Sequence, residues 1–301
     1  PDPLREPMRA KYWIGLSVRK QVPIITSGII YTWATYFRPG VRFEDLAGEF
    51  WIRMFMVQIF CGVIIGILTP VAFAAGGQDD MQKITDFSID RTEVTIKQYA
   101  KFVSETGYVT AAERRGGGLV FASGWEQKAG WVWSSPFGIP ANPGEPAVHL
   151  TVNDATAYCA WAGKRLPTDK EWVLAAYTEF RRVPPPPFET GQTYPYPTGP
   201  TPDGANCLGD CGLIPAQDYS ARLNRGRGPA LAGTTAPGVN GLYDMGANVW
   251  EWTDDGGASE YPTRGGSWWY GSGRMRAENR ATKPKKMAAV YIGFRCAKGA
   301  D

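Results

Sequence analysis

Histidine and net charge are both scarce in this chain. It has one histidine, His149, in 301 residues, and its formal net charge is only +3. One histidine cannot supply the several imidazole ligands of a histidine metal centre. A charge this small, without a clustered basic stripe, gives no reason to expect a nucleic-acid partner. His149 lies in an apolar stretch, so we expect it to be a core residue with satisfied hydrogen bonds.

Cysteine is also sparse, with five residues in the whole chain. Cys61 lies inside an apolar run and is expected to behave as a small hydrophobic residue. The other four form an even set in a part of the chain that we expect to be exported, which favours disulfides. A zinc site is the alternative for Cys207 and Cys211, but no second ligand pair has suitable spacing.

Glycine, proline and tryptophan are abundant instead. The 36 glycines, 24 prolines and 12 tryptophans indicate a loop-rich domain packed with aromatic side chains rather than a helical bundle. Aromatic residues at this density bury enough surface to offset chain entropy, so disorder is not expected. The length suits one large domain or two small ones.

An apolar run of 22 residues, 54–75, carries no charge (MFMVQIFCGVIIGILTPVAFAA). As a helix it would extend about 33 Å, which is enough to cross the hydrocarbon core of a bilayer. Its last residues also resemble a signal-peptidase site. The region ahead of the run is about fifty residues long, whereas a signal peptide has about 15–30 residues in total. We therefore predict a retained membrane anchor in contact with the lipid bilayer.

Basic residues are concentrated before this run and few follow it closely. The positive-inside rule then predicts a single-pass protein of the inner (cytoplasmic) membrane, with a cytoplasmic N-terminus and a periplasmic C-terminal domain. The predicted parts are a cytoplasmic or interfacial segment 1–53, a transmembrane helix 54–75 and a periplasmic domain 76–301. Whether residues 21–37 enter the membrane is left open. The basic residues are Arg5, Arg9, Lys11, Arg19 and Lys20.

The periplasmic part has several recognisable local patterns. Thr168 followed by Glu171 forms a capping box that predicts the start of a helix. Residues 182–202 are rich in proline and are expected to form a surface loop. The regular elements predicted are a strand at 87–90 and helices at 92–106, 150–163 and 169 to about 180.

Several motifs follow one another in a distinctive order. They are FSIDRTEVTIKQYAKFVSETGYVT (87–110), AVHLTVNDATAYCAWAGKRLPTDKEW (147–172), ANC (205–207), GLYDMGANVWEW (241–252), RGGSW (264–268) and GFRC (293–296). Together they resemble the formylglycine-generating enzyme, or sulfatase-modifying factor, family. The resemblance implies an α+β domain with a C-type-lectin-like core, little regular secondary structure and many ordered loops.

The resemblance also assigns roles to individual residues. Cys159 and Cys296 match a cysteine pair that is disulfide-bonded in the family enzyme. Cys207 and Cys211 would close a small loop, as in many bacterial relatives.

Four residues match a calcium site of this family: Asp244, Ala247, Val249 and Glu251. Two carboxylates and two backbone carbonyls close together suit a cation that prefers oxygen ligands. The alternative is that the two acidic residues cap turns while Trp250 and Trp252 pack in the core. A second calcium site would use Asn206 and the carbonyl of Cys207, with further ligands from near Asp218.

The family enzyme oxidises a sulfatase cysteine with a reactive cysteine pair just after its Gly-Gly-Ser motif. Residues 268–276 of this chain contain no cysteine. Without thiolates there is no soft ligand for copper, and the iron site of another relative uses histidines. We therefore expect neither copper nor iron in the domain.

Three functions are compatible with these features. The first is a non-catalytic structural or docking subunit of a larger membrane complex, for example a respiratory or photosynthetic one. The second is a glycan- or peptide-binding module, in which Trp268, Trp269 and Tyr270 form a stacking platform. The third is an oxidase-type enzyme with altered chemistry. The lost cysteines and the membrane anchor favour the first hypothesis, although a fold alone does not decide a function.

Overall fold

The computed structural model describes residues 80–299. The predicted anchor at 54–75 and the segment 21–37 lie outside the described residues. Within 80–299, no helix is both long enough and apolar enough to cross a membrane.

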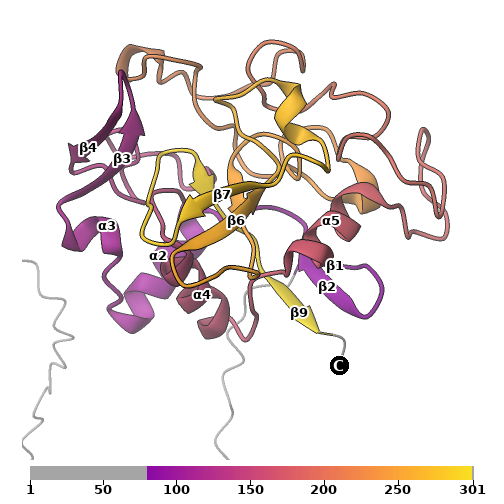
Figure 1. Cartoon of the computed structure of the whole chain (residues 1–301), viewed down its shortest axis with the longest axis horizontal. Coiled ribbons are helices and arrows are strands. Elements are labelled where there is room, and N and C mark those ends of the chain that lie inside the picture. Colours follow the sequence, from indigo (N-terminus) through magenta and orange to yellow (C-terminus); the bar gives the residue numbers. More distant parts are fainter. Residues whose placement is uncertain (1–79, 300–301) are drawn as a thin grey trace, which may run out of the picture. The chain divides into compact units, whose positions relative to one another are not determined.

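Helices make up a small part of the described chain (Figure 1). Strand β2 coincides with the strand predicted at 87–90, and α2, α4 and α5 lie within the three predicted helices. No regular helix or strand occurs between residues 182 and 202, as expected from the prolines. The α-helices are α2 (Ile96–Thr106), α3 (Ala111–Arg114), α4 (Val152–Trp161) and α5 (Asp169–Tyr177).

The strands form three small sheets. The first has the order β1-β2-β9, the second is the hairpin β3-β4, and the third has the order β7-β6-β5-β8. In the third sheet, β5 pairs antiparallel with β6 and parallel with β8. The strands are β1 (Met81–Lys83), β2 (Phe87–Asp90), β3 (Gly117–Phe121), β4 (Trp125–Ala129), β5 (Trp250–Trp252), β6 (Glu260–Arg264), β7 (Ala281–Pro284), β8 (Ile292–Gly293) and β9 (Ala297–Gly299).

Every α-helix of the described region starts with the same local device. A threonine side chain accepts a hydrogen bond from the backbone amide three residues on, and the side chain of that residue accepts one from the threonine backbone amide. This capping box satisfies backbone groups that the first helical turn leaves free. The predicted pair Thr168 and Glu171 is confirmed. The other caps are Thr95, Thr110 and Thr151.

Aromatic side chains fill the core. Tyr99 of α2 lies with its ring centroid 5.3 Å from Trp133 and 5.6 Å from Tyr158 of α4. Trp250 and Trp252 of β5 are 2% and 0% exposed, so they are core residues as predicted. These contacts join helices to the central sheet, because aromatic rings bury large areas in offset or edge-to-face pairs.

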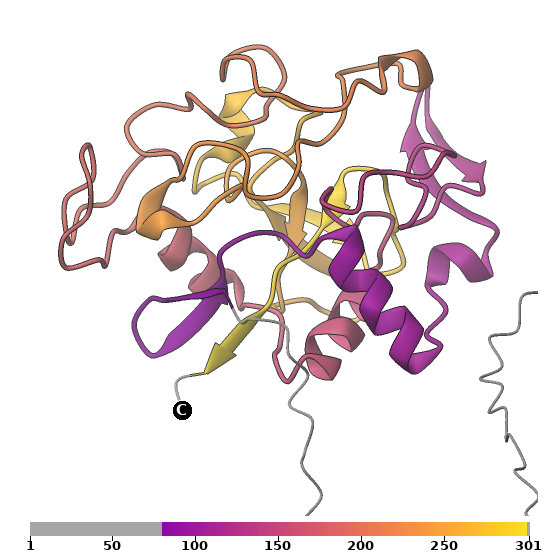
Figure 2. The same ribbon diagram turned by 180° about the vertical axis from the view of Figure 1, so that it is seen from behind.

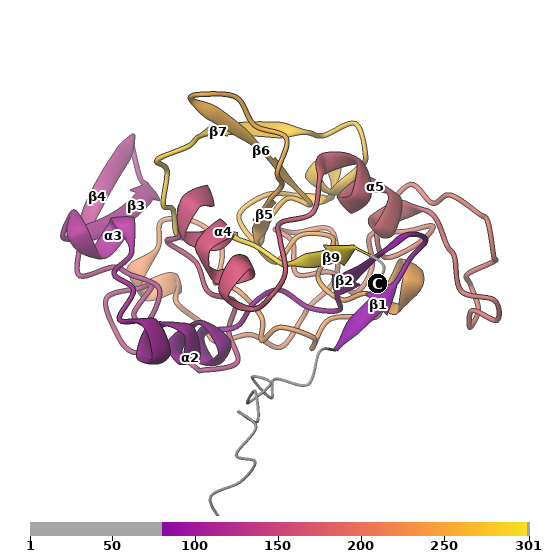
Figure 3. The same cartoon turned by 90° about the horizontal axis from the view of Figure 1, so that it is seen from below.

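The β3-β4 hairpin stands at one end of the domain, and the β1-β2-β9 sheet lies toward the other (Figures 1 and 3). Between α5 and β5 the chain is mostly coil. This coil forms the upper side of the domain, as the view from behind also shows (Figure 2). The predicted abundance of long ordered loops is thus confirmed.

Both predicted disulfides are present. Cys159 in α4 is bonded to Cys296, 137 residues away, while Cys207 and Cys211 close a loop of separation four. The long-range bond fixes α4 to the last turn before β9. In the chain-entropy model a loop of this size contributes about 4–5 kcal/mol, and a short loop contributes much less.

This difference gives a stability prediction. Replacing Cys159 and Cys296 with alanine is expected to lower the free energy of unfolding by about 2–5 kcal/mol. The matched control replaces Cys207 and Cys211 with alanine and should lower it by less. Urea unfolding followed by tryptophan fluorescence measures both values. Equal losses in the two variants would contradict the loop-length argument.

Candidate functional site

The turn that leads into β5 has an unusual backbone. Asp244, Ala247 and Asn248 have φ values of 60°, 62° and 46°, in the left-handed region. Side chains other than glycine adopt this region rarely, and asparagine and aspartate tolerate it best. Such a turn persists only when surrounding contacts hold it in place.

Glu251 of β5 is held by a buried arginine. Arg295 donates from Nε to Glu251 Oε2 at 2.7 Å and from a terminal nitrogen to Oε1 at 2.7 Å. Trp172 of α5 donates a third hydrogen bond to Glu251 at 2.8 Å. All three side chains are 0% exposed. The planar guanidinium matches the carboxylate in two parallel hydrogen bonds, which makes the geometry specific as well as strong.

Two further buried carboxylates lie in the same cluster. Asp244 accepts hydrogen bonds of 2.6 Å from the Gly233 amide and from Thr235 Oγ1. Glu93 accepts one of 2.8 Å from the Asn248 side chain and one of 3.2 Å from the Val249 amide. Glu93 therefore holds the turn at Asn248 and Val249. Sequence analysis did not single it out, although it lies in the first family motif.

Negative charge is in excess in this cluster. Burial raises the pKa of Glu93 well above its usual value, and the nearby Asp244 and Glu251 raise it further. Burial also raises the pKa of Asp244. Burial opposes the charged form of Arg295, but Glu251 reverses this effect and the pKa of Arg295 is raised. One guanidinium thus faces three carboxylates, and burial drives two of them, Glu93 and Asp244, toward the neutral form.

The predicted calcium ligands fit this cluster chemically. Each oxygen of Asp244 accepts one hydrogen bond and keeps a second lone pair for another partner. A divalent cation would also balance the excess negative charge, and oxygen ligands are those that calcium prefers. Arg295 and Trp172 already donate three hydrogen bonds to the Glu251 carboxylate without a metal. Calcium at Asp244, Ala247, Val249 and Glu251 therefore stays a prediction.

The second predicted calcium site has less suitable surroundings. Asn206 donates from its side-chain amide to Gly228 O at 3.1 Å and to Asn248 Oδ1 at 3.0 Å. Asn206 and Cys207 line a small hollow together with the cation Arg227. Arg227 in turn lies 3.4 Å from the carboxylate of Asp218. A guanidinium at this position opposes a metal cation.

Calcium dependence can be measured directly. Adding calcium to chelator-treated protein is expected to raise the melting temperature, because a ligand that binds only the folded state stabilises it. Magnesium should have a smaller effect, since it loses its water ligands reluctantly. An Asp244→Ala variant should lose the response to calcium. Identical melting curves with calcium and with chelator would show that the prediction is wrong.

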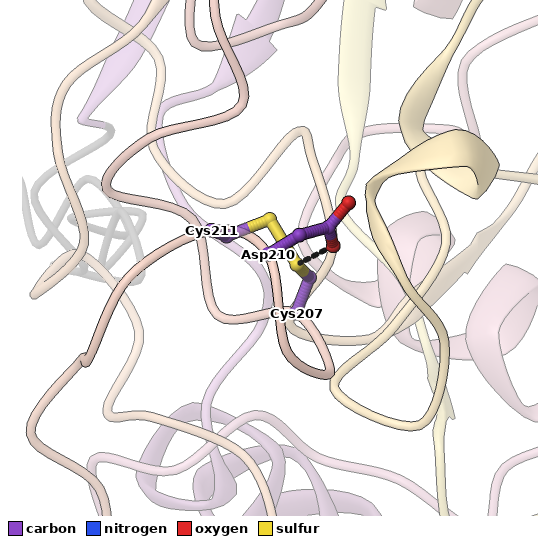
Figure 4. Close-up of side chains that lie close together, drawn as sticks. All are labelled: Cys207, Asp210 and Cys211. Carbon is purple, nitrogen blue, oxygen red and sulfur yellow. Dashed lines mark hydrogen bonds between the residues drawn. A yellow bond between two sulfur atoms is a disulfide. The ribbon is translucent and has the colours of Figure 1, made fainter.

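The short disulfide lies beside residues 268–276. The carboxylate of Asp210 is 3.3 Å from Cys207 Sγ (Figure 4). Cys207, Asp210 and Cys211 come close enough together to resemble a metal site, but the two sulfurs are bonded to each other. The disulfide prediction for this pair is confirmed. The zinc alternative is wrong for the bonded pair, because neither sulfur is a free thiolate.

The segment 268–276 is tightly packed. Asp210 accepts hydrogen bonds from the backbone and the hydroxyl of Ser272, and the Leu208 amide donates to Tyr270 O at 2.9 Å. Tyr177 donates to the Met275 carbonyl at 2.6 Å. The Met275 side chain is fully buried, with its sulfur 3.6 Å from Cys211 Sγ. A loop held at three points has a defined shape.

The predicted stacking platform needs a correction. Trp268 and Trp269 are only 2% and 3% exposed, because their rings pack into the core. Tyr270 alone is partly exposed, and it lines two neighbouring hollows. Trp125 of β4, which sequence analysis did not single out, is 47% exposed. The sequence does not show which face of a hairpin strand a tryptophan occupies, because this depends on the packing of the hairpin against the rest of the domain.

The two hollows that share Tyr270 differ in chemistry. We call the first the aromatic groove; it has a volume of 460 Å³ and is lined mainly by Leu119, Trp125, Tyr270, Met287 and Tyr291, with Lys283 and Lys286. We call the second the arginine hollow; it has a volume of 600 Å³ and is lined by Arg225, Arg274, Asn279 and Asp210 around the backbone of 270–273.

His149 is a core residue, as predicted. It is fully buried, and its Nε2 lies 2.9 Å from the Pro136 carbonyl. Its ring packs against Gly118, where a side chain would clash with it. Burial lowers the pKa of His149 to about 4. The imidazole is therefore neutral at neutral pH.

This shift has a defined effect on stability. Between pH 6.5 and about 4, the unfolded chain binds a proton at His149 and the folded chain does not. Stability should thus fall as the pH falls through this range, by on the order of 3 kcal/mol from this residue. In a His149→Asn variant, whose side chain tolerates a positive φ, this component should disappear. Parallel pH profiles of the unfolding free energy in both proteins would refute the assignment.

These residues define a loop-rich α+β domain with three small sheets and a buried carboxylate–arginine cluster at the centre. The model of the sulfatase-modifying factor enzyme 1-like domain matches residues 72–300, so the chain belongs to that family.

Relatives in this family include active and inactive proteins. The chain is 33% identical to a formylglycine-generating enzyme of Thermomonospora curvata, covering 76% of this chain and 88% of that one. It is also 33% identical to inactive C-alpha-formylglycine-generating enzyme 2 of Bos taurus, covering 74% and 81%. Among solved structures, PvdO from Pseudomonas aeruginosa aligns with a TM-score of 0.46 at 22% identity, covering 71% and 80%.

Proposed function

We propose that this protein is a non-catalytic docking subunit of a membrane protein complex, anchored by residues 54–75 with its domain 76–301 in the periplasm. One observation carries the proposal. The four cysteines of residues 80–299 are all joined in disulfides, and the segment 268–276 contains none of them. The described part of the domain therefore offers no thiolate for the chemistry of the family enzyme.

The other side chains support the same proposal. The only histidine is buried and neutral, so it cannot serve as a base for a nucleophile at the surface. Hydrogen bonds to Asp210, Leu208 and Tyr177 hold the segment 268–276 in place, and none of its side chains is a nucleophilic thiol. A relative at 33% identity is itself named inactive.

Binding of a ligand in the aromatic groove is the second candidate function. It is favoured by Trp125 and Tyr270, which offer ring surface beside a hollow of 460 Å³. Most ligand sites are concave and mainly apolar, with a few polar groups that fix orientation. Docking and ligand binding are compatible if the ligand is a segment of a partner protein.

The membrane role can be tested on the native protein. After mild detergent extraction from its own membranes, the chain is expected to co-purify with other membrane subunits in a defined ratio. A matched control replaces residues 54–75 with an unrelated apolar span, which keeps the anchor and changes any specific contacts within the bilayer. Mass spectrometry identifies the partners. Migration as a free monomer without partners would overturn the proposal.

A separate assay addresses catalysis. The full chain, supplied with copper and a cysteine peptide from a sulfatase, is expected to form no aldehyde. The Thermomonospora curvata enzyme serves as the positive control under the same conditions. Aldehyde formation by this chain would show that the domain is an enzyme after all.

A further inference from the structure

The aromatic groove has an exposed apolar wall. Phe121 and Trp125 face each other across the β3-β4 hairpin, with ring centroids 5.4 Å apart, and are 40% and 47% exposed. Trp125 also lies 6.2 Å from the ring of Tyr291, on the inner side of the groove. Such aromatic surface beside a hollow is typical of a binding site rather than of scattered surface residues.

The lining of the groove is also cationic. It contains Lys283 and Lys286, and Lys285 is their neighbour in the sequence. None of these lysines forms an ion pair with a carboxylate of residues 80–299. Lys283 instead lies 4.9 Å from the Trp250 ring, and Lys285 lies 5.4 Å from the Tyr261 ring. Burial and the nearby Arg274 lower the pKa of Lys283, so an anion bound beside it would favour its charged form.

The positive charge continues past Tyr270. Arg225 lies 6.0 Å from the Tyr270 ring, and both Arg225 and Arg274 line the arginine hollow. The one carboxylate in the lining, that of Asp210, is already bonded to Ser272. The aromatic groove and the arginine hollow therefore share Tyr270, and basic side chains line both.

The groove also has a strand at its border. β7 is an edge strand in the order β7-β6-β5-β8, and its residues Thr282, Lys283 and Pro284 line the groove. An extended peptide beside an edge strand can use main-chain hydrogen bonds, with pockets for alternate side chains. Pro284 limits this pairing to part of the strand, because proline has no amide hydrogen.

We propose that the aromatic groove docks an extended segment of a partner protein in which acidic side chains alternate with aromatic or aliphatic ones. The apolar side chain would pack between Trp125, Tyr270 and Tyr291, and the acidic ones would pair with Lys283, Lys286 and the arginines. This inference rests on the proposed docking function and adds the chemistry of the partner. A concave groove fits an inserted chain better than the flat surface of a lipid bilayer does.

Two labelled octapeptides test the charge preference. One alternates glutamate with phenylalanine, and the other alternates lysine with phenylalanine. Fluorescence anisotropy with the full chain in detergent should show binding of the glutamate peptide, and at least about tenfold weaker binding of the lysine peptide. Affinity should fall with increasing salt, since part of it is electrostatic.

Two pairs of variants separate the groove from the rest of the surface. Lys283→Glu/Lys286→Glu should weaken the glutamate peptide by at least about tenfold and improve the lysine peptide. Lys97→Glu/Lys170→Glu changes the net charge equally on exposed helix residues and should have little effect. Trp125→Ala should weaken both peptides, whereas Leu213→Ala, at a residue 93% exposed elsewhere, should not. Lys286→Glu alone, at an exposed position, covers the case in which the double variant fails to fold.

The outcomes are distinct. Equal affinity for the two peptides, or equal loss in both lysine double variants, overturns the proposal. Binding of phosphatidylglycerol vesicles that depends on Lys283 and Lys286, without binding of either peptide, assigns the groove to a membrane surface and also overturns it. If co-purification with membrane subunits succeeds while the peptides fail, the docking function stands and uses another face. If the glutamate peptide binds and nothing co-purifies, the proposal for the groove is supported and the proposed membrane complex is overturned.

Discussion

The buried ion pair between Arg295 and Glu251 is the interaction on which the rest of the structure depends. Besides Glu251, the guanidinium donates to the carbonyls of Asp90, Arg91 and Tyr243 at 2.7–3.1 Å. One side chain near the C-terminal end of the domain thus joins the end of β2, the turn before β5 and β5 itself. Removing one partner of such a pair costs about 3–5 kcal/mol, because it leaves an uncompensated buried charge.

Arg295 also contacts the strained turn before β5, through its hydrogen bond to the Tyr243 carbonyl. Asp244, Ala247 and Asn248 lie in the left-handed region, and the turn is held by Glu93 on one side and by Thr235 on the other. A cluster with more carboxylates than cations is stable only if some of them are protonated or if a cation is bound. Hydrogen bonds to Glu93 and Asp244 hold the turn, and the excess negative charge of the cluster is the reason for predicting calcium there.

Around this centre, the family scaffold and its chemistry are separable. The short disulfide and Asp210 hold the segment 268–276 in shape without any free thiol there. The half-buried Tyr270 of this segment lines both a groove with aromatic and lysine side chains and a hollow with arginines. Such surfaces recognise a partner by shape and charge and need no reacting group.

From the sequence alone, motif order indicated the family and, through the resemblance, both disulfides, and one capping box indicated the start of α5, because these signals are local or one-dimensional. It also identified Asp244 and Glu251. It did not reveal that Arg295 binds Glu251 or that Glu93 binds Asn248 and Val249 of the same turn, since these contacts join residues 44 to 156 positions apart. It misjudged Trp268 and Trp269 as exposed, and it passed over Trp125. The buried face of a short strand or loop depends on strand register and on neighbours distant in the chain. The ligand-accessible surface could therefore be located only in the folded protein.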